Sequence, residues 1–470
     1  MKILLINPPA FNGYDYIREG RCMQKKSSWA SMWMPLTLAY IAGVLRKDNE
    51  IRMIDCQADN IDFKELQSVI KEYLPDLLIN NTSFPTIKSD LRVLQIAKEI
   101  HPEIKTAIFG MYPTLLREKV FDETNFLDFS IVGEPEWSFD FLVTALKGKI
   151  SLKDVPGLLF KNVNNIIEKN VVQDFTTNTL DDLPFPARDL LHNEKYKYPL
   201  NKKPFTLLML SRGCPYGCTF CNAHQYYGKK FRKRTISSII AEIEDCINNY
   251  GISNFLFWGE SFSLDFDYAN EITDAILGKG LKINWSTRTM VDRIDETLLR
   301  KMKQAGCRSL SLGIETPNQA ILNDVKKGTQ IVDIKNAIKA VNAAGIISIG
   351  HFIIGLPGDN EKNANDTIKF SMKSGLDYAQ FYCAVPYPNT PMGELARIQN
   401  WIESEDYTKY HLADAVMGNE DLSAADIKRL RKKAYLKFYS RPKVYFNTLK
   451  RIDSVKTLLA PFDFKNWAIG

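Results

Sequence analysis

The stretch SRGCPYGCTFC, residues 211–221, directly follows an apolar run, Phe205 to Leu210, that is predicted to form a buried strand. Three of the chain's eight cysteines fall in it, Cys214, Cys218 and Cys221, with the spacing C-x3-C-x2-C. The glycine and proline residues between them keep the segment out of a helix, so the thiolates can converge. A closed zinc site needs four protein ligands, whereas three thiolates around a four-iron cluster leave one iron open to a small molecule. The spacing therefore favours an iron–sulfur cluster over an incomplete zinc knuckle or three unrelated thiols.

The composition is that of an ordinary globular protein with more than one domain. At 470 residues the chain is too long for one usual core, so two or three domains are expected. Hydrophobic residues make up 45% and charged residues 25%, and a net charge of +6 does not by itself indicate nucleic acid. No window has the apolar length of a membrane span and no signal peptide is evident. A cytoplasmic location is predicted, where clusters are favoured over disulfides.

Residues 1–150 alternate strand-like apolar runs with helical stretches. The first run ends at Pro8 and Pro9, and a polar loop follows it. The predicted strands are Lys2–Asn7, Ile51–Ile54, Leu77–Ile79, Thr106–Phe109 and Phe129–Val132. This alternation predicts a doubly wound parallel sheet, in which ligands bind beyond the carboxyl ends of the strands. The candidate binding residues at those ends are Pro8, Asp55, Gln57, Thr82, Ser83, Gly110, Pro113, Thr114, Gly133 and Glu134. Plain turns at the strand ends are the alternative.

The remainder of the chain divides into three parts. Residues 151–195 are predicted to be a linker with a β-hairpin that begins near Val155 and a proline-rich joint, Leu183–Pro186. Residues 196–395 repeat six strand–helix units. The predicted strands are Phe205–Leu210, Asn254–Trp258, Ile283–Ser286, Ser309–Gly313, Ser348–Ile354 and Tyr378–Ala384. Residues 396–470 are predicted to form a helical, basic region with interleaved aromatic residues.

The cysteine spacing, with Phe220 directly before the last cysteine, resembles the cluster loop of the radical S-adenosylmethionine (SAM) enzymes. The resemblance implies a partial (β/α)6 TIM-like barrel and a [4Fe-4S] cluster held by Cys214, Cys218 and Cys221, whose open iron binds SAM. A reducing donor such as a flavodoxin or ferredoxin would supply the electron that cleaves SAM to methionine and a 5′-deoxyadenosyl radical. In such a barrel, chemistry is expected at the carboxyl ends of the strands.

The order of the N-terminal features resembles the Rossmann-like cobalamin-binding domain that precedes the barrel in a large subfamily. This subfamily includes cobalamin-dependent methylases and the anaerobic ring cyclase of chlorophyll synthesis. Residues 55–60, DCQADN, match its D-x-H-x-x-G motif, with Gln57 in place of His and Asn60 in place of Gly. Because Gln57 lacks the imidazole nitrogen, the resemblance implies base-off cobalamin with no His on cobalt. A degenerate domain that no longer binds cobalamin is the alternative.

The resemblance also implies a SAM pocket at the strand ends. Residues 258–260, WGE, are similar to the family's G-G-E phrase, and residues 350–359, GHFIIGLPGD, resemble its G-x-I-x-G-L-P-G-E phrase. The implied SAM-binding residues are Gly259, Glu260, Ser286, Arg288, Glu315, Ile354 and Gly355. The alternatives are a surface turn at Gly259 and Glu260, a surface role for Arg288, and an ion pair of Glu315 with Arg288 or Arg308.

Other polar residues lie near these positions. Tyr382 and Cys383 are the candidate catalytic residues, with an aromatic turn packed on the core as the alternative. His224 and His351 are interpreted as structural histidines, either of which could move a proton. The basic run KKFRKR, residues 229–234, is expected to be solvated, with attraction of an anionic substrate or an electron donor as the alternative.

The favoured function is methyl transfer to an unactivated carbon of a small-molecule or lipid substrate by a cobalamin-dependent radical SAM enzyme. A cobalamin-dependent cyclase, hydroxylating or carbon–carbon coupling enzyme is the first alternative, and a non-catalytic iron–sulfur or corrinoid carrier the second. Transfer RNA methylthiolation is disfavoured because the N-terminal domain has only Cys22 and Cys56, and no nucleic-acid partner is expected. The basic C-terminal region leaves contact with a membrane surface open.

Overall fold

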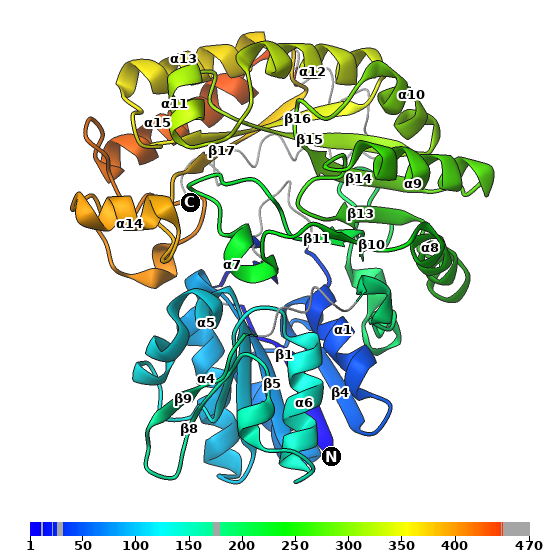
Figure 1. Cartoon of the computed structure of the whole chain (residues 1–470), viewed down its shortest axis with the longest axis vertical. Helices are drawn as coiled ribbons and strands as arrows, with labels where there is room; N and C mark the ends of the chain where they lie inside the picture. The colour runs from blue at the N-terminus through cyan, green and yellow to red at the C-terminus, as the bar shows by residue number, and fades with distance from the viewer. Residues whose placement is uncertain (11–12, 21, 26–31, 173–178, 443, 445–470) are drawn as a thin grey trace. The chain divides into compact units, whose positions relative to one another are not determined.

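The computed structural model describes the chain except for residues 11–12, 21, 26–31, 173–178, 443 and 445–470 (Figure 1). The described residues form two compact units. The first takes in residues 1–25, 32–196 and 222–232, and the second takes in residues 197–221 and 233–444. Each unit contains a sheet of mostly or entirely parallel strands covered by helices, so the predicted α/β class is confirmed.

The first unit is built on a seven-stranded sheet in the order β4-β1-β5-β6-β7-β8-β9. Its strands are β1 (Lys2–Asn7), β4 (Glu50–Asp55), β5 (Leu77–Thr82), β6 (Lys105–Gly110), β7 (Phe129–Ile131), β8 (Leu158–Lys161) and β9 (Ile167–Lys169). Neighbours from β4 to β7 pair in parallel, whereas β8 and β9 add an antiparallel hairpin at one edge. The chain order reverses between β1 and β5, which is where ligands bind in doubly wound sheets.

Helices cover both sides of this sheet (Figure 1). Helix α1 (Leu36–Leu45) packs against α6 (Glu136–Leu146), and α3 (Phe63–Tyr73) packs against α4 (Ile87–Ile100). Asp62 caps the first turn of α3 in a capping box with Glu65, and the helix buries Leu66, Ile70 and Tyr73 at helical spacing. Short helices α2 (Cys56–Asp59) and α5 (Met111–Leu116) follow β4 and β6, and α7 (Ala223–Tyr227) packs on α5.

A β-hairpin occupies the segment that was predicted to be a polar loop. Strands β2 (Tyr16–Glu19) and β3 (Cys22–Lys25) pair antiparallel. The side chain of Arg18 is buried and forms an ion pair of 2.9 Å with Asp90 of α4. The loop prediction was wrong here because contacts distant in sequence, rather than an alternating apolar pattern, hold this hairpin.

The second unit is built on a six-stranded sheet in the order β10-β13-β14-β15-β16-β17, in which every neighbouring pair is parallel. The strands are β10 (Phe205–Met209), β13 (Asn254–Trp258), β14 (Asn284–Thr289), β15 (Cys307–Glu315), β16 (Ile347–Ile354) and β17 (Tyr378–Cys383). Figure 1 shows the helices between them along one side of the sheet. These helices are α8 (Ile236–Tyr250), α9 (Phe266–Gly278), α10 (Glu296–Gln304), α12 (Ile331–Ala343) and α13 (Glu361–Lys373).

The two faces of the six-stranded sheet differ in chemistry, because successive side chains along a strand point to opposite faces. On the helix-covered face, Phe257 stacks on Trp285 at 4.6 Å and Phe352 stacks on Phe381 at 5.3 Å between ring centroids. Along β14, β16 and β17, partly exposed residues alternate with these buried ones. The opposite face, called the polar face below, carries Trp258, Ser286, Arg288, Ser311, His351, Gln380 and Tyr382.

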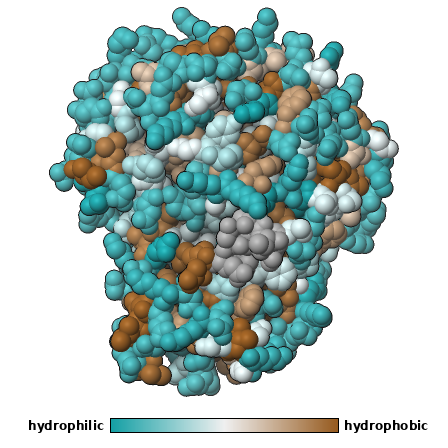
Figure 2. All heavy atoms as spheres, viewed as in Figure 1, coloured by the Kyte–Doolittle hydropathy of each residue, from teal (hydrophilic) through white to brown (hydrophobic). Residues whose placement is uncertain are grey.

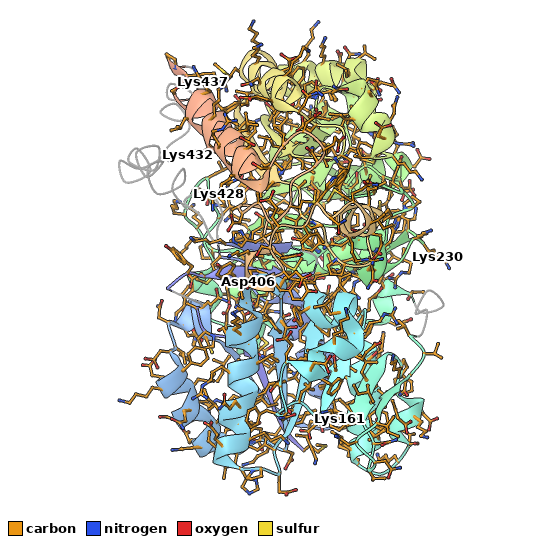
Figure 3. All side chains as sticks on the ribbon, turned by 90° about the vertical axis from the view of Figure 1, so that its left-hand side faces the viewer. Lys161, Lys230, Asp406, Lys428, Lys432 and Lys437 are labelled. Atoms are coloured by element: carbon orange, nitrogen blue, oxygen red, sulfur yellow. The ribbon has the colours of Figure 1, made fainter. Side chains whose placement is uncertain are left out.

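The C-terminal part of the second unit contains α14 (Pro391–Ile398) and α15 (Ala424–Tyr439). Helix α15 starts in a capping box between Ser423 and Asp426 and packs on α13 and β17. Figure 3 shows Lys428, Lys432 and Lys437 spaced along its length. The rest of the predicted basic helical region, residues 445–470, lies outside the described residues.

Candidate functional site

The three predicted cluster ligands lie in one loop that follows β10. Cys214, Cys218 and Cys221 are free thiols, each partly buried. Gly213, with φ of +85°, turns the chain directly before Cys214, in a backbone region that disfavours a Cβ. Burial raises the pKa of the Cys218 thiol to about 11; nearby Lys327 lowers it, while the nearby thiols of Cys221 and Cys214 raise it. The three thiols therefore share one electrostatic environment.

Backbone hydrogen bonds and apolar packing hold this loop in place. The amide of Thr219 donates to the carbonyl of Val325 and its carbonyl accepts from the amide of Met392, each at 3.0 Å. Phe220 packs against a buried core cluster that includes Val325 and Met392. The aromatic residue before the last cysteine thus anchors the part of the loop that carries Cys218 and Cys221. Over the described residues, no group of three or more His, Cys, Asp or Glu side chains meets the geometry for a single metal ion.

A buried ion pair lies beside the cysteine loop. Lys327 Nζ donates to Oε1 of Glu315 at 2.7 Å, with side-chain exposures of 10% and 9%. Glu315 ends β15 with φ of +63°, next to a register shift against β16, and a Cβ on Gly313 would lie 2.9 Å from Lys327 Nζ. Burial alone would lower the pKa of Lys327, but Glu315 and the thiol of Cys218 raise it above its ordinary value. Lys327, which sequence analysis missed, is thus the ion-pair partner of Glu315.

Arg288 lies on the polar face against Trp258. Its guanidinium lies 4.2 Å from the centre of the Trp258 ring, a cation–π geometry. The tryptophan that replaces the first glycine of the G-G-E phrase therefore positions this arginine. At Gly259, a Cβ would lie 2.7 Å from Oγ of Ser211, so only glycine allows this close approach to the start of the cysteine loop. Arg288 is therefore held against the ring and is not an isolated surface side chain.

Ser286 lies deeper in the sheet than Arg288. It pairs in register with Leu256 in the middle of β13, two residues before Arg288 along β14. Its hydroxyl hydrogen bonds to the hydroxyl of Tyr198 and, at 2.6 Å, to that of Ser309. These protein partners, which sequence analysis did not identify, already occupy the hydroxyl of this predicted SAM-binding residue.

The GLPGD segment after β16 is shaped by a buried carboxylate and by close packing. Asp359 accepts a hydrogen bond from the amide of Gly355 at 2.9 Å, and burial raises the pKa of Asp359 to about 6. Gly355 has φ of +88°, and a Cβ there would lie 2.3 Å from Cδ1 of Ile427 in α15. Ile354 is fully buried, whereas its neighbour Ile353 is partly exposed on the polar side. Gly355 thus has a packing role, and Ile353 rather than Ile354 lies on the polar face.

The two candidate catalytic residues of β17 lie on opposite faces. Cys383 is buried on the same face of β17 as Phe381, whose ring contacts Tyr435 of α15. Burial raises the pKa of the Cys383 thiol to about 12. Tyr382 lies on the polar face, where its hydroxyl is 2.9 Å from Nδ1 of His351. Of the two candidates, Tyr382 is therefore the one on the same face as Arg288.

In the first unit, the residues of the DCQADN segment form a turn at the end of β4. Asp55 caps α2 and accepts hydrogen bonds of 2.8 Å from Asn7 Nδ2 and from the hydroxyl of Tyr196. Burial raises the pKa of Asp55, and these hydrogen bonds lower it in part. Asn60 ends α2 in the left-handed conformation, with φ of 55°, and so takes the conformational role of the motif's glycine. The amide oxygen of Gln57 accepts from the amide of Tyr16 in the hairpin at 2.6 Å.

Neighbouring strand ends are tied together by hydroxyl groups. Thr82 Oγ1 donates to the carbonyl of Phe109 at 2.7 Å. Thr114 Oγ1 donates to the carbonyl of Gly110 at 2.7 Å and accepts from the amide of Gly133 at 3.1 Å. Gly110 is required at its position because a Cβ would lie 2.1 Å from the carbonyl oxygen of Thr82. Of the other predicted residues here, Ser83 hydrogen bonds to Thr86, Pro8 accepts from Arg18, Pro113 is buried in α5, and Glu134 pairs with Arg232.

The basic run at residues 229–234 is not a solvated segment throughout, so that expectation was wrong. Arg232 is 8% exposed and pairs with Glu134, and Arg234 is 3% exposed and pairs with Glu242. Lys233 pairs with Asp265 at 2.7 Å. The sequence pattern could not show this, because a run of basic residues has the same composition whether or not its acidic partners lie elsewhere in the fold.

The protein has two α/β units, and the second carries a C-x3-C-x2-C loop at the carboxyl end of its first strand. This arrangement is typical of enzymes that use an iron–sulfur cluster and SAM. Residues 208–371 match the family model of the Radical SAM superfamily. An uncharacterized methyltransferase of Pyrococcus horikoshii is 32% identical over 447 residues, 94% of this chain and 94% of the relative. The chain therefore belongs to the radical SAM superfamily and is a radical SAM enzyme, whose domain implies a [4Fe-4S] cluster and SAM.

Two further comparisons extend over most of the chain. The anaerobic magnesium-protoporphyrin IX monomethyl ester cyclase of Cereibacter sphaeroides is 25% identical, over 88% of this chain and 68% of the cyclase. The radical SAM methyltransferase TsrM of Kitasatospora setae, solved with cobalamin and a [4Fe-4S] cluster bound, has a TM-score of 0.72 at 14% identity. That match covers 100% of this chain and 99% of TsrM, so the likeness in fold includes both units.

Figure 2 shows a mainly hydrophilic surface on the face it presents, with hydrophobic side chains in separate patches. Among the helices of the described residues, none combines the length and the apolar character needed to cross a bilayer.

Proposed function

We propose that this protein is a cobalamin-dependent radical SAM methylase that adds a methyl group to an unactivated carbon of a small-molecule substrate. The observation that carries the proposal is the grouping of Cys214, Cys218 and Cys221 in one anchored loop of a six-stranded parallel sheet. The full-length similarity to a relative named a methyltransferase supports methyl transfer over other radical outcomes. In this proposal, residues 1–150 bind cobalamin, residues 151–195 are the linker, residues 196–395 form the radical SAM barrel, and residues 396–470 are the C-terminal region.

The cysteine loop fits a [4Fe-4S] cluster by its donor set, which is three thiols in one environment and no fourth cysteine in the loop. When bound, the cluster supplies the electron that cleaves SAM. The chain's own residues hold the cluster loop and orient SAM. Phe220 and Thr219 fix the loop in place. Arg288 is stacked on Trp258 and offers a planar set of donors to an anionic group. Gly259, Glu260 and Arg288 are our proposed SAM-binding residues, and Lys327 forms the buried ion pair with Glu315.

The first unit fits cobalamin without a protein ligand to cobalt. Its sheet reverses order between β1 and β5, whose carboxyl ends carry Asn7 and Thr82, while Asp55 ends the neighbouring strand β4. The amide of Gln57 is hydrogen bonded to the hairpin and to the carbonyl of Pro8, so it stabilises the turn and is not directed at a metal. A low-potential donor such as a flavodoxin or ferredoxin is our proposed reductant.

A radical cyclase is the second candidate function, favoured by the similarity to the magnesium-protoporphyrin cyclase over 88% of this chain. The two functions differ in their products. Methyl transfer converts one SAM to S-adenosylhomocysteine for each methyl group delivered, whereas cyclisation forms none.

The test is anaerobic reconstitution with iron, sulfide and cobalamin, followed by measurement of 5′-deoxyadenosine and S-adenosylhomocysteine. We expect the wild-type enzyme to form 5′-deoxyadenosine and Cys218→Ala to lose this activity. Cys246→Ala is the matched control, because Cys246 is a free cysteine in α8, outside the cysteine loop. Persistence of 5′-deoxyadenosine in Cys218→Ala, or equal loss in Cys246→Ala, would contradict the assignment.

A further inference from the structure

An open groove with a volume of about 610 Å³ lies on the second unit, beside the cysteine loop. Its wall includes Thr219, which stands between Cys218 and Cys221 in the chain. None of its residues belongs to the polar face or to the proposed SAM-binding residues, so the groove is a separate feature of this unit. The eleven described residues that line it are Thr219, Asp324, Val325, Pro357, Gly358, Pro391, Met392, Leu395, Gln399, Trp401 and Glu420.

Two carboxylates give the groove a negative charge. Asp324 ends helix α11 (Gln319–Asp324), and its Oδ2 lies 4.0 Å from the point where a Cβ on Gly358 would stand. Glu420 lies against the same glycine, because its Oε1 accepts a hydrogen bond of 2.8 Å from the amide of Gly358. Burial and, to a smaller extent, the charge of Glu420 raise the pKa of Asp359 to about 6. The lining contains no lysine, arginine or histidine, so no cation of the lining neutralises these charges.

Asp324 has no structural partner that accounts for its charge. Its side chain is exposed and, among the described residues, forms no hydrogen bond and no ion pair. The helix dipole disfavours a carboxylate at the C-terminal end of a helix. The carboxylate of Asp324 therefore does not stabilise α11 and is available to a ligand in the groove.

The rest of the lining is mostly apolar and includes an indole ring. Trp401 is partly buried and packs against the core cluster that contains Val325 and Met392. Its backbone is also held in place, since its amide donates to the carbonyl of Ala396 and its carbonyl accepts from the amide of Gly418, each at 2.9 Å. An indole in the same groove as two carboxylates favours an organic cation, because the face of the ring and the carboxylates both attract positive charge.

The size of the groove suits a small molecule better than a protein. Its volume lies within the range of about 300–1,000 Å³ that is typical of small-molecule sites. A stable protein interface involves roughly 20–30 residues on each side, whereas eleven line this groove. Its size and charge therefore favour a compact cationic ligand over a docked protein.

We propose that this groove is a binding site for a small organic cation, whose ammonium group pairs with Asp324 and Glu420 and whose apolar body packs on Trp401 and Leu395. The site goes beyond the proposed function and does not require it, because the cluster, SAM and cobalamin take no part in this recognition. A ligand bound here also contacts Thr219, which connects the site to the loop that carries the cluster cysteines.

Fluorine NMR of the full-length protein labelled with fluorotryptophan, before reconstitution, tests the site. The chain has seven tryptophans, and Trp401→Phe identifies the signal of Trp401. The probes are phenethylamine, which is a cation at neutral pH, and phenethyl alcohol, which has the same ring and chain without the charge. We expect phenethylamine to shift the Trp401 signal saturably and the alcohol to leave it unchanged at the same concentration. Equal shifts from both probes, or no shift with phenethylamine, would overturn the proposal.

Asp324→Asn tests the role of the charge. We expect this variant to bind phenethylamine about two- to fivefold more weakly, as for the loss of a solvent-screened ion pair. Its melting temperature should be unchanged, because Asp324 has no structural partner. Asp421→Asn is the matched control, because Asp421 is an exposed carboxylate next to Glu420 that does not line the groove.

Two outcomes of this second test would overturn the proposal: wild-type affinity in Asp324→Asn, or an equal loss of affinity in Asp421→Asn. A lysine tripeptide serves as a further probe, because it carries the same ammonium chemistry on a peptide chain. If it shifts the Trp401 signal at lower concentration than phenethylamine, the small-molecule assignment is wrong and a basic segment of a partner protein is the occupant.

Discussion

The ammonium of Lys327 lies 2.7 Å from a carboxylate oxygen of Glu315, and this buried pair adjoins the cysteine loop of the second unit. Three local features accommodate it: the left-handed conformation of Glu315, the register shift of β15 against β16, and the absence of a side chain at Gly313. Taken together, they show that the end of β15 is shaped around an ion pair.

We expect Lys327→Met to destabilise the protein strongly, because it leaves the Glu315 carboxylate buried without its partner. Removing one member of a buried pair costs about 3–5 kcal/mol, whereas replacing both by apolar residues is often near neutral. The double variant Lys327→Met with Glu315→Leu should therefore recover most of the loss. Denaturant unfolding of the apoprotein measures both. Lys362→Met is the control, because Lys362 and Asp366 are exposed and such a pair contributes about 0.5 kcal/mol or less. A double variant as unstable as the single one would contradict this account.

Gly213→Ala should lower the iron content after reconstitution more than Gly217→Ala does. Gly213 has φ of +85°, and a Cβ in the left-handed region costs about 1–2 kcal/mol, which would shift the chain at Cys214. At Gly217, by contrast, a Cβ would meet nothing within 4 Å. Iron and sulfide analysis and the visible absorbance of the cluster measure the difference. Equal iron content in the two variants would show that the turn at Gly213 does not position Cys214.

Much of this fold could be predicted from the sequence because its strands carry their own signal. Each of the six predicted strand runs of the second unit overlaps an observed strand, and the cysteine spacing is a local pattern. Lys327 could not be recognised in the same way, since its partner Glu315 lies across a helix and a turn. The β2–β3 hairpin escaped prediction for a similar reason: Arg18 and Asp90, which hold it, are 72 residues apart in the chain, 90 minus 18. Tertiary contacts, not local propensity, decide such positions.

Asp359 should make stability depend on pH between about 4 and 6. Its folded-state pKa of about 6 exceeds the ordinary value of 3.8 because of burial, so the folded protein binds this proton more tightly than the unfolded chain does. The resulting stabilisation is fully present below pH 3.8 and is lost as pH rises through about 6. A shift of this size corresponds to about 3 kcal/mol.

Asp359→Asn isolates this contribution. Its stability relative to the wild type should become more favourable by up to about 3 kcal/mol between pH 4 and pH 7.5, because the amide does not ionise. Unfolding curves at a series of pH values provide the measurement. Asp366→Asn serves as the control, since 44% of the Asp366 side chain is exposed and Lys362 lowers its pKa. A difference between Asp359→Asn and wild type that stays constant with pH would refute the sign argued above.

In Gln57→Ala, bound cobalamin should keep its base-off spectrum. The substitution should lower the free energy of unfolding, mainly because it removes a hydrogen bond to the hairpin. The Gln57 oxygen accepts from the amide of Tyr16 at 2.6 Å, and its nitrogen donates to the carbonyl of Pro8 at 3.4 Å. Loss of the stronger bond leaves a partly buried amide without its acceptor, which costs about 1–3 kcal/mol. Visible and electron paramagnetic resonance spectra of the cobalamin-loaded protein, with denaturant unfolding of the apoprotein, separate the two effects. We expect no change in the cobalt spectrum, because Gln57 is held by the turn and is not directed at a metal. A changed cobalt spectrum in Gln57→Ala together with unchanged stability would instead show that this side chain contacts the cofactor.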